Sequence, residues 1–348
     1  MKQEKVLIVG GGLAGTILGL TFFRKEIPFT LIDNNLKDSA STVAAGIFNP
    51  LVFKRYTLSW RAKEHIESLY EFCNYFEAKF QTHFHPLDFL KAIEHKDELD
   101  LFYKKKSKDE FQSFLGEEKN MDSNAAINKC LSHISIKSGG WLDIIPFLNN
   151  AHDFLKENDS FLNKEFSYSD LQQTEAGVSY QNTEYSKVIF AEGFHVKNNP
   201  WFGNIPLKPV KGEVLTIECK DLKLEHSYNK NIFILPLGEN KFRVGATYNW
   251  DDLTNQTTEQ GKQELIEKLN KAINREYKII NHKAGVRPAS IDRRPIIGIH
   301  PKHKNLYVFN GFGTKGVMLI PLWAKHLVEH FIFGKEISNE VNLLRFNL

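Results

Sequence analysis

The feature that most constrains this chain lies near its N-terminus, where a short apolar run meets a glycine-rich turn. Residues 6–9 are continuously apolar, which is typical of a fully buried strand, and the spacing Gly10-x-Gly12-x-x-Gly15 interrupts the run abruptly. Apolar residues then recur at helical spacing from Leu13 onward. A strand, a glycine turn and a helix in this order form the context that the dinucleotide-binding fingerprint requires.

Each glycine of this turn has a physical task in such a fingerprint. Gly10 makes the tight turn, Gly12 lets the backbone approach a pyrophosphate, and Gly15 lets the helix pack closely on the strand. The phosphates would lie on free N–H groups at the start of the helix, where the helix dipole favours anions.

A second predicted strand, residues 29–32, ends in Asp33, about 20 residues after the turn, where an acid should bind ribose hydroxyls. The alternative interpretation is an ordinary glycine turn followed by a surface aspartate. We expect a bound dinucleotide. The residues of this region that are expected to contact it are Gly10, Gly12, Leu13, Ala14, Gly15, Asp33 and Asn34.

The chain as a whole limits the possible partners and compartments. Its 348 residues suit two domains, and its formal net charge of +3 is too small to indicate a nucleic-acid or membrane partner. Cys73, Cys130 and Cys219 are far apart and have no metal-binding or CxxC spacing, so we expect reduced thiols, no metal and a cytoplasmic protein. Because residues 1–5 run straight into the first predicted strand, we expect no signal peptide, and no apolar run approaches the length of a membrane span.

A stretch rich in small residues follows the second predicted strand. Residues 39–50 include Ala44, Ala45 and Gly46, and a proline restricts the end of the stretch to extended conformations. Small side chains let a backbone lie close to another group. We therefore expect a loop that lies along the cofactor through Ala44, Ala45 and Gly46, with an ordinary surface loop as the alternative.

The remaining elements follow from periodicity. We expect helices over 60–80, from 145 to 155 and over 260–273, and antiparallel strands over 213–218, 232–235 and 242–246. Residues 188–191 read as a buried strand, capped by Glu192 and Gly193, that resumes the first, parallel sheet after an insertion, and Gly193 is an expected cofactor contact. The basic run at 104–108 is flanked by acids, which indicates a solvated helical face; a nucleic-acid contact is the minor alternative.

A second glycine-rich turn lies near the C-terminus, between a predicted strand at 306–309 and a C-terminal helix. Another helix N-terminus, with its partial positive charge, would thus be available to a ligand. The cofactor contacts expected from this turn are Gly313, Thr314, Lys315, Gly316 and Val317.

The order of these motifs resembles the D-amino-acid-oxidase-like flavoproteins, and glycine oxidases in particular. Seven stretches carry the resemblance, in the same order along most of the chain: 10–15, 44–50, 208–213, 242–247, 284–288, 294–298 and 311–316. Seven ordered motifs are specific, whereas the first alone is weak evidence. The least similar part lies between residues 83 and 133.

The resemblance implies an α/β fold with a Rossmann-like FAD-binding domain that is discontinuous in sequence, formed by residues 1–82, 139–206 and 288–348. A smaller α+β substrate domain, with an antiparallel sheet, would comprise residues 83–138 and 207–287. Sarcosine oxidases attach FAD through a cysteine near the C-terminal turn; none lies there in this chain, so non-covalent FAD is implied. The flavin would perform the hydride chemistry, and the protein would supply position and electrostatics.

Arg287 matches the arginine that clamps the substrate carboxylate in glycine oxidases. A planar guanidinium offers two parallel hydrogen bonds to a carboxylate, which makes this role physically sensible. A surface ion pair is the alternative for Arg287, and Arg243, on an alternating strand, is expected to be structural.

Three departures from the family concern the substrate more than the fold. Glycine oxidases place a tyrosine where Phe233 stands, and a second arginine where Thr314 stands. Lys315 instead matches an arginine in the FAD domain of the bifunctional tRNA enzyme that makes methylaminomethyl-thiouridine, where carboxymethyl is removed from a uridine substituent. Met318 stands where sarcosine oxidases carry an oxygen-activating lysine, so fast reaction with oxygen is not implied.

The leading hypothesis is an FAD-dependent oxidoreductase that acts on the CH–NH bond of a small amino acid or N-substituted glycine. Arg287 would hold the carboxylate, and Lys315 would assist near the flavin or the carboxylate. One alternative takes the same chemistry to a modified tRNA uridine, which the modest charge makes less favourable. Another is a dinucleotide-binding protein without catalysis.

Overall fold

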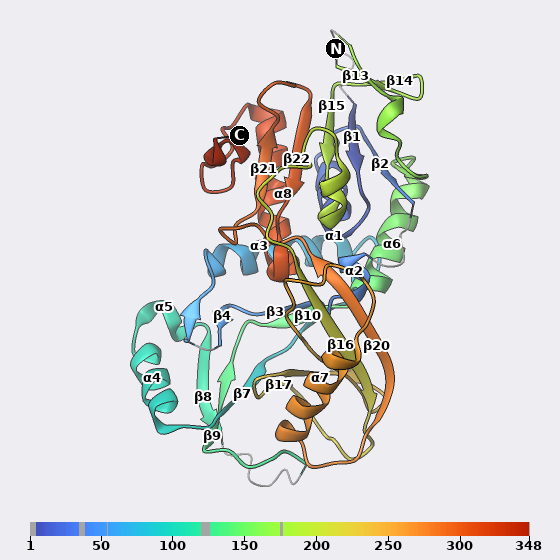
Figure 1. Ribbon diagram of the computed structural model, residues 1–348. Coiled ribbons are helices and arrows are strands. Elements are labelled where there is room, and N and C mark those ends of the chain that lie inside the picture. Colours follow the sequence, from blue (N-terminus) through green and yellow to red (C-terminus); the bar gives the residue numbers. More distant parts are fainter. Residues whose placement is uncertain (1–4, 35–38, 54, 120–125, 175–176, 348) are drawn as a thin grey trace.

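Two large sheets organise the protein, one in the upper and one in the lower half of Figure 1. The computed structural model describes residues 5–34, 39–53, 55–119, 126–174 and 177–347. The upper sheet has six strands in the order β11 (Phe161–Asn163), β2 (Phe29–Asp33), β1 (Val6–Val9), β15 (Lys187–Phe190), β22 (Leu306–Asn310) and β21 (Ile296–Ile299).

The upper sheet joins strands that are far apart in the sequence. β1 pairs in parallel with both β2 and β15, and β15 pairs in parallel with β22, while β21 runs antiparallel at the edge. The expectation that the first sheet resumes near residue 188 is therefore confirmed. The α/β fold class is confirmed as well.

Successive side chains of a strand point to opposite faces of the sheet, so the upper sheet has an apolar core on each face. Helices cover one of these faces. Val6 and Ile8 face a core shared with α1 (Leu13–Arg24), α3 (Ala62–Glu77), α6 (Ile144–Glu157) and α8 (Gly316–Phe333). Leu7 and Val9 face a second core. That core also contains side chains of a small sheet formed by β12 (Leu171–Gln173), β13 (Val178–Tyr180) and β14 (Thr183–Tyr185).

The lower sheet has eight strands and draws on two stretches of chain. Its order is β20 (Lys278–Arg287), β16 (Val210–Glu218), β19 (Lys241–Gly245), β18 (Phe233–Gly238), β17 (Ser227–Asn229), β7 (Phe89–Ile93), β9 (Ser132–Ile136) and β8 (Leu115–Lys119). Every pairing is antiparallel except that of β17 with β7. The expected antiparallel sheet is confirmed, whereas the domain boundaries stay a prediction.

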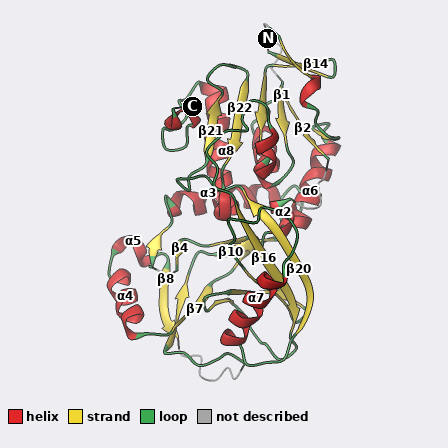
Figure 2. Cartoon of the chain, viewed as in Figure 1, coloured by secondary structure: helices red, strands yellow, loops and turns green. Residues whose placement is uncertain are grey.

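Helices and short elements complete the lower half and the junction between the sheets (Figure 2). α7 (Glu259–Ala272) packs on the lower sheet, and α4 (Lys96–Lys106) and α5 (Asp109–Gln112) contribute to a smaller core beside β7. The remaining short elements are α2 (Ala40–Val43), β3 (Ile47–Phe48), β4 (Leu51–Val52), β5 (Thr57–Leu58), β6 (Phe84–Pro86), β10 (Gly140–Leu142), η1 (Tyr168–Asp170), η2 (Gly193–Asn198), η3 (Gly313–Lys315) and η4 (Leu343–Phe346).

Three expected elements differ in detail from the structure. The stretch 39–50 is not a plain loop, because the Ser39 hydroxyl accepts the Thr42 N–H and caps the short helix α2, and β3 follows. The helix expected over 60–80 begins at Ala62, since Arg61 takes a left-handed conformation with φ of 48°, and it ends three residues early, at Glu77. The helix expected to reach residue 273 ends one residue earlier, at Ala272.

None of the helices in the described residues has both the length and the apolar character needed to cross a membrane.

Candidate active site and cofactor cavity

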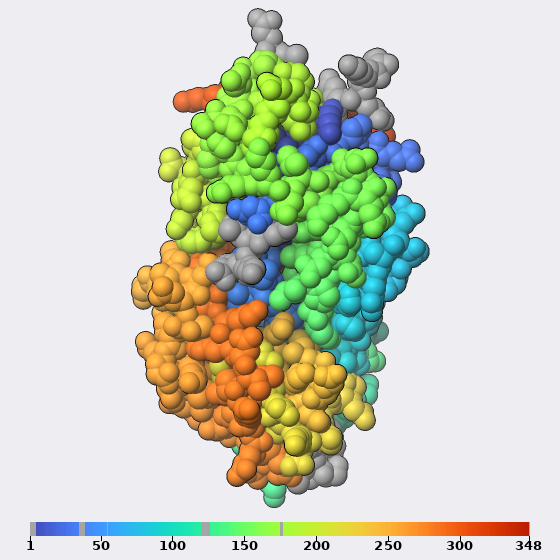
Figure 3. Space-filling view, turned by 90° about the vertical axis from the view of Figure 1, so that its right-hand side faces the viewer, coloured from blue at the N-terminus to red at the C-terminus, as the bar shows by residue number. Residues whose placement is uncertain are grey.

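A cavity of about 1030 Å³ lies between the two sheets and brings the predicted site residues together. Its volume is at the upper end of the range for ligand pockets, which is the size a large cofactor needs. In the space-filling view, blue atoms of the N-terminal part are visible between the green segment that contains α6 and the orange segment that contains β20 (Figure 3). The sequence-predicted residues that line it are Gly10, Gly12, Leu13, Ala14, Asp33, Asn34, Ala44, Ala45, Gly46, Gly193, Arg287, Gly313, Thr314, Gly316 and Val317.

The first glycine turn has the geometry that the fingerprint requires. Gly10 has φ of +102°, which a side chain would strain, and a Cβ on Gly15 would lie 1.8 Å from the Gly10 carbonyl oxygen. Gly15 is therefore a packing residue behind the cavity and not part of its lining. Gly15 thus has the helix–strand packing role expected from the sequence, but it does not line the cavity, where a cofactor contact was also expected of it.

The N–H groups of the turn are only partly used within the protein. The Gly11 N–H donates to Asp33 Oδ1 at 2.9 Å, and the Leu13 N–H donates to Ser41 Oγ at 3.0 Å. Among the hydrogen bonds of the described residues, none uses the N–H of Gly12 or of Ala14. Two donors at the positive end of α1 are thus available to an anion, as a dinucleotide pyrophosphate would require.

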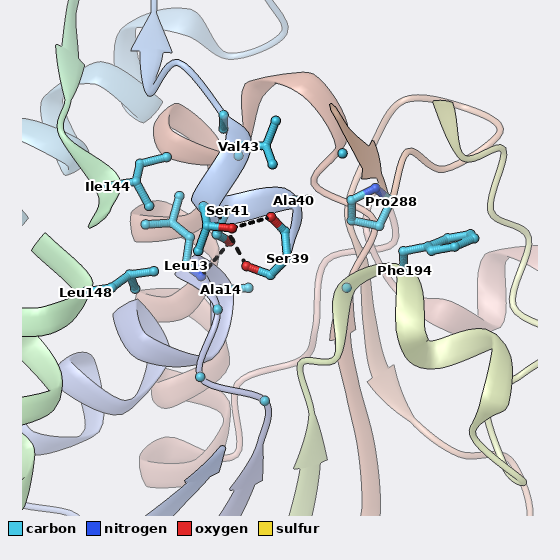
Figure 4. Close-up of a pocket in the computed structure, with 18 of the residues that line it drawn as sticks. Leu13, Ala14, Ser39, Ala40, Ser41, Val43, Ile144, Leu148, Phe194 and Pro288 are labelled. Atoms are coloured by element: carbon cyan, nitrogen blue, oxygen red, sulfur yellow. Dashed lines mark hydrogen bonds between the residues drawn. The ribbon is translucent and has the colours of Figure 1, made fainter. Parts of the chain in front are cut away.

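Two residues that sequence reasoning missed hold this turn in place. Ser41, on α2, lies against the start of α1, as the dashed lines in Figure 4 show. The His152 ring of α6 has Nε2 3.0 Å from the Gly11 carbonyl oxygen and 2.9 Å from the Thr16 hydroxyl. Burial lowers the pKa of His152, so the ring is neutral at physiological pH. Only the small-residue run around Ser41 offered a signal in the sequence.

Segments from other parts of the chain form the remaining walls. Figure 4 shows Ile144 and Leu148 of α6 on one side of the glycine turn and Pro288 and Phe194 on the other. Gly46 has φ of +73°, and a Cβ there would lie 1.9 Å from the Leu142 carbonyl oxygen, so the segment after α2 must pass close to β10.

Arg287 is the last residue of β20. Its side chain lies over the neighbouring strand β16 and lines the cavity. A Cβ on Gly212 of β16 would lie 2.0 Å from Arg287 Nη2, so the guanidinium lies directly over this glycine. Arg287 Nη1 donates to the Thr247 carbonyl at 3.4 Å, and Cζ lies 4.9 Å from the centre of the Tyr248 ring. Burial lowers the pKa of Arg287, and Tyr248 opposes that shift; no carboxylate within the described residues pairs with it.

Lys315 does not line the cavity, although its neighbours on both sides do. Its Nζ donates to the Ser59 hydroxyl and, at 3.4 Å, to the Leu51 carbonyl, so it ties the start of α8 to the hairpin of β4 and β5. Burial lowers its pKa to about 8. The role near a flavin or carboxylate stays a prediction. Arg243 is outside the lining as well, and its Nη1 donates to the Ala44 carbonyl at 3.4 Å.

The fold and the cavity together define a dinucleotide-binding α/β protein whose second sheet closes over the nucleotide site. Residues 5–330 match the family described as FAD dependent oxidoreductase, DAO, and the chain belongs to that family. It is thus an FAD-dependent oxidoreductase. The family is one of enzymes, so the alternative of a dinucleotide-binding protein without catalysis is not retained. The described residues contain no group of three or more His, Cys, Asp or Glu side chains that could hold a metal.

Curated relatives are similar at low identity. The chain is 24% identical over 386 residues to the tRNA 5-methylaminomethyl-2-thiouridine biosynthesis bifunctional protein MnmC of Legionella pneumophila (strain Philadelphia 1), covering 97% of this chain and 55% of that protein. It is 27% identical over 164 residues to glycine oxidase of Bacillus subtilis, covering 44% of each chain. The chain thus spans about half the length of the curated relatives it matches, or less.

Solved structures share the whole fold. Glycine oxidase from Geobacillus kaustophilus superimposes with a TM-score of 0.79 at 19% identity, covering 96% of both chains. Iminodiacetate oxidase from Chelativorans sp. BNC1 gives a TM-score of 0.78 at 18% identity, covering 96% of this chain and 97% of that one. At these identities the likeness establishes the architecture.

Proposed function

We propose that this protein oxidises the CH–NH bond of a small amino acid or N-substituted glycine, with transfer of a hydride to FAD. The observation that carries the proposal is Arg287, a cavity-lining guanidinium that has no acidic partner among the described residues. An unpaired cation in a partly desolvated site favours an anionic ligand strongly. The relatives whose names specify glycine oxidase support an amino-acid carboxylate as that ligand.

The residues present fit FAD. The free N–H groups of Gly12 and Ala14 would receive the pyrophosphate, and Asp33 and Asn34 lie at the end of β2, where the ribose would bind. When bound, FAD accepts the hydride that leaves the substrate carbon. No cysteine side chain lines the cavity in the part of the chain that the structure describes, which supports non-covalent binding.

The chain itself contributes position and electrostatics. Arg287 would hold the substrate carboxylate through two N–H donors and so fix the neighbouring carbon and its amine. The first turn of α8 lines the cavity through Gly316 and Val317, and its dipole favours negative charge at that wall. A neutral amine beside the C–H bond requires no protein nucleophile, so the reaction depends on orientation.

An anaerobic titration of the purified holoenzyme tests the proposal. Glycine, sarcosine and proline are added in turn, and we expect at least one to bleach the flavin absorbance band. Arg287→Ala should retain the flavin band and raise the apparent substrate constant about 100-fold, since a charge-assisted bidentate contact contributes about 3 kcal/mol. Arg275→Ala, outside the cavity lining, is the matched control. An unaltered substrate constant in Arg287→Ala would remove Arg287 from the site.

A second candidate is oxidation of a carboxymethylaminomethyl group on a modified tRNA uridine. The match to MnmC, which covers 97% of this chain, favours it, and the substituent is itself an N-substituted glycine. Bleaching of the flavin by the free modified nucleoside, and RNA binding that weakens with added salt, would support this candidate. Bleaching by sarcosine alone, without RNA binding, would exclude it.

A further inference from the structure

Two exposed aromatic side chains stand side by side next to Arg287. Tyr248 is 53% exposed and Trp250 is 55% exposed, although large aromatic residues are usually well buried. Their ring centres are 6.2 Å apart and their planes differ by 27°, a stacked arrangement. Tyr248 also lines the cavity. The pair therefore extends the cavity wall outward from the carboxylate site.

Arg287, Tyr248 and Trp250 form one continuous row of flat groups. The guanidinium carbon lies 4.9 Å from the Tyr248 ring centre, and the indole of Trp250 stacks on that ring. A molecule held by its carboxylate at Arg287 would thus have flat aromatic surface beside it. Flat π-surfaces bind other planar rings through offset or edge contacts, beyond the gain from buried area alone.

The segment that carries the pair is firmly anchored, so the exposure of the rings is a fixed feature. Asn249, between the two aromatic residues, exchanges both backbone hydrogen bonds with Lys211 of β16, at 2.8 and 3.0 Å. The fully buried Lys211 ammonium pairs with Asp252 on the same segment. The Asn249 side chain accepts the N–H groups of Asp251 and Asp252 at 2.9 and 3.0 Å.

Anchoring of this kind removes the ordering cost that a flexible loop would add on binding. The residues next to the two rings along the chain, Asn249, Asp251 and Asp252, are polar. The segment therefore offers two aromatic rings between polar residues and not the run of apolar residues expected of a protein-docking face.

We propose that Tyr248 and Trp250 form an outer subsite for a planar ring attached to the amine nitrogen of the substrate. The inference rests on the proposed function and narrows its substrate class. The substrate would be an N-(arylmethyl)glycine or a close heteroaromatic equivalent, with its carboxylate on Arg287 and its ring against the aromatic pair. Free glycine and sarcosine use only the inner part of such a site.

The test compares two ligands of similar size, N-benzylglycine and N-(cyclohexylmethyl)glycine, on the FAD holoenzyme. Their kcat/KM values and their dissociation constants, from the perturbed flavin absorbance under anaerobic conditions, are measured in parallel. We expect the planar ring to be favoured about tenfold in both quantities. In Trp250→Ala this ratio should fall to near one, and in Trp250→Phe most of it should remain. Tyr103→Ala, an exposed aromatic on α4 that is 49% exposed, should leave the ratio unchanged.

The outcomes separate the two proposals. If sarcosine is oxidised but the two ring ligands are treated alike, the outer subsite is wrong and the proposed function stands. If no amine reduces the flavin but the planar ligand binds preferentially, and Trp250→Ala abolishes that preference, the subsite stands and the proposed function falls. If neither ligand binds and no amine reacts, both are wrong.

Discussion

The two walls of the cavity differ in the groups that they present to a ligand. The wall after β1 presents backbone, because Gly10 and Gly12 carry no side chains, and Gly15 packs closely behind it. The wall formed by β20 and the segment after β19 presents side chains, chiefly Arg287 and Tyr248. A backbone wall recognises a ligand shared by a whole family and tolerates few changes. A side-chain wall recognises one substrate class and can be altered residue by residue.

The largest effect is expected where the backbone wall is breached. Gly15→Val should destabilise the protein by about 3 kcal/mol and abolish flavin binding, because the new Cβ would lie 1.8 Å from the Gly10 carbonyl oxygen and the turn must move. Urea unfolding and the flavin-to-protein absorbance ratio measure both effects. Gly316→Ala, whose Cβ would lie 3.5 Å from Ile320, should unfold at nearly the wild-type urea concentration. Normal flavin content in Gly15→Val would contradict the comparison.

The stability of the protein should depend on pH through His65, a buried histidine of α3 that bonds Trp323 of α8. His65 is fully buried, accepts the Trp323 Nε1–H at 3.1 Å and has Nδ1 3.0 Å from the Trp60 carbonyl, so it is neutral with its proton on Nδ1. Burial lowers its pKa from 6.5 to about 4. Between these values the unfolded chain binds the extra proton, so stability falls as the pH drops from 6.5 to 4 and is fully present above 6.5.

The size of this acid effect is about 3 kcal/mol, the equivalent of the pKa difference. Urea unfolding at several pH values should show a shallower pH dependence in His65→Gln than in the wild type. His303→Gln, which alters a surface contact with Gln173, is the control and should keep the wild-type slope. Equal slopes in His65→Gln and the wild type would show that His65 is not held neutral.

The substitution Gly212→Ala should impair substrate binding by displacing the Arg287 guanidinium while its charge remains. Gly212→Ala places a Cβ 2.0 Å from Arg287 Nη2, so the guanidinium must shift away from its position in the cavity. We expect kcat/KM for an amino-acid substrate to fall about 30-fold, because misplaced orienting groups lose much of their contribution. Flavin content and unfolding should change little, since a flexible side chain can yield. Unchanged kinetics would mean that Arg287 acts from another conformation.

The smallest effect is expected at Ser41, where the two kinds of wall meet. Ser41→Ala removes the acceptor of the Leu13 N–H and should weaken FAD binding or stability by about 1 kcal/mol. A flavin-release titration in parallel with unfolding would detect it. Thr42→Ala, which alters a hydroxyl bonded at 2.9 Å to the Ser39 carbonyl within α2, is the neighbouring control. A loss as large as that of Gly15→Val would show that Ser41 does more than complete the turn.

The backbone wall was the more predictable of the two from sequence. A strand, a glycine turn and a helix follow one another within about 20 residues, so local pattern rules capture them. The side-chain wall depends on strand register, which places Gly212 opposite Gly285 and Val210 opposite Arg287. No local pattern specifies that register, and only the family resemblance drew attention to Arg287.

Other contacts escaped sequence reasoning for the same reason. His152 lies in the helix expected from 145 to 155, and helical spacing does not indicate that it bonds the glycine turn across 141 positions of sequence. The direction of the Lys315 side chain toward Ser59 depends on where the β4–β5 hairpin lies. Helix ends were misplaced by one to three residues because backbone conformations such as that of Arg61 leave no compositional signature.

The connectivity of the upper sheet has a consequence for biosynthesis. β1 and β2 lie within the first 33 residues, but their sheet gains β15 only at residues 187–190 and β22 at residues 306–310. During translation the edge of β15 that pairs with β22 therefore stays open until all eight strands of the lower sheet have been synthesised. Such edges invite aggregation. Gly313, Thr314, Gly316 and Val317 of the cavity wall are made later still, so the FAD site can be completed only after nearly the whole chain has been synthesised.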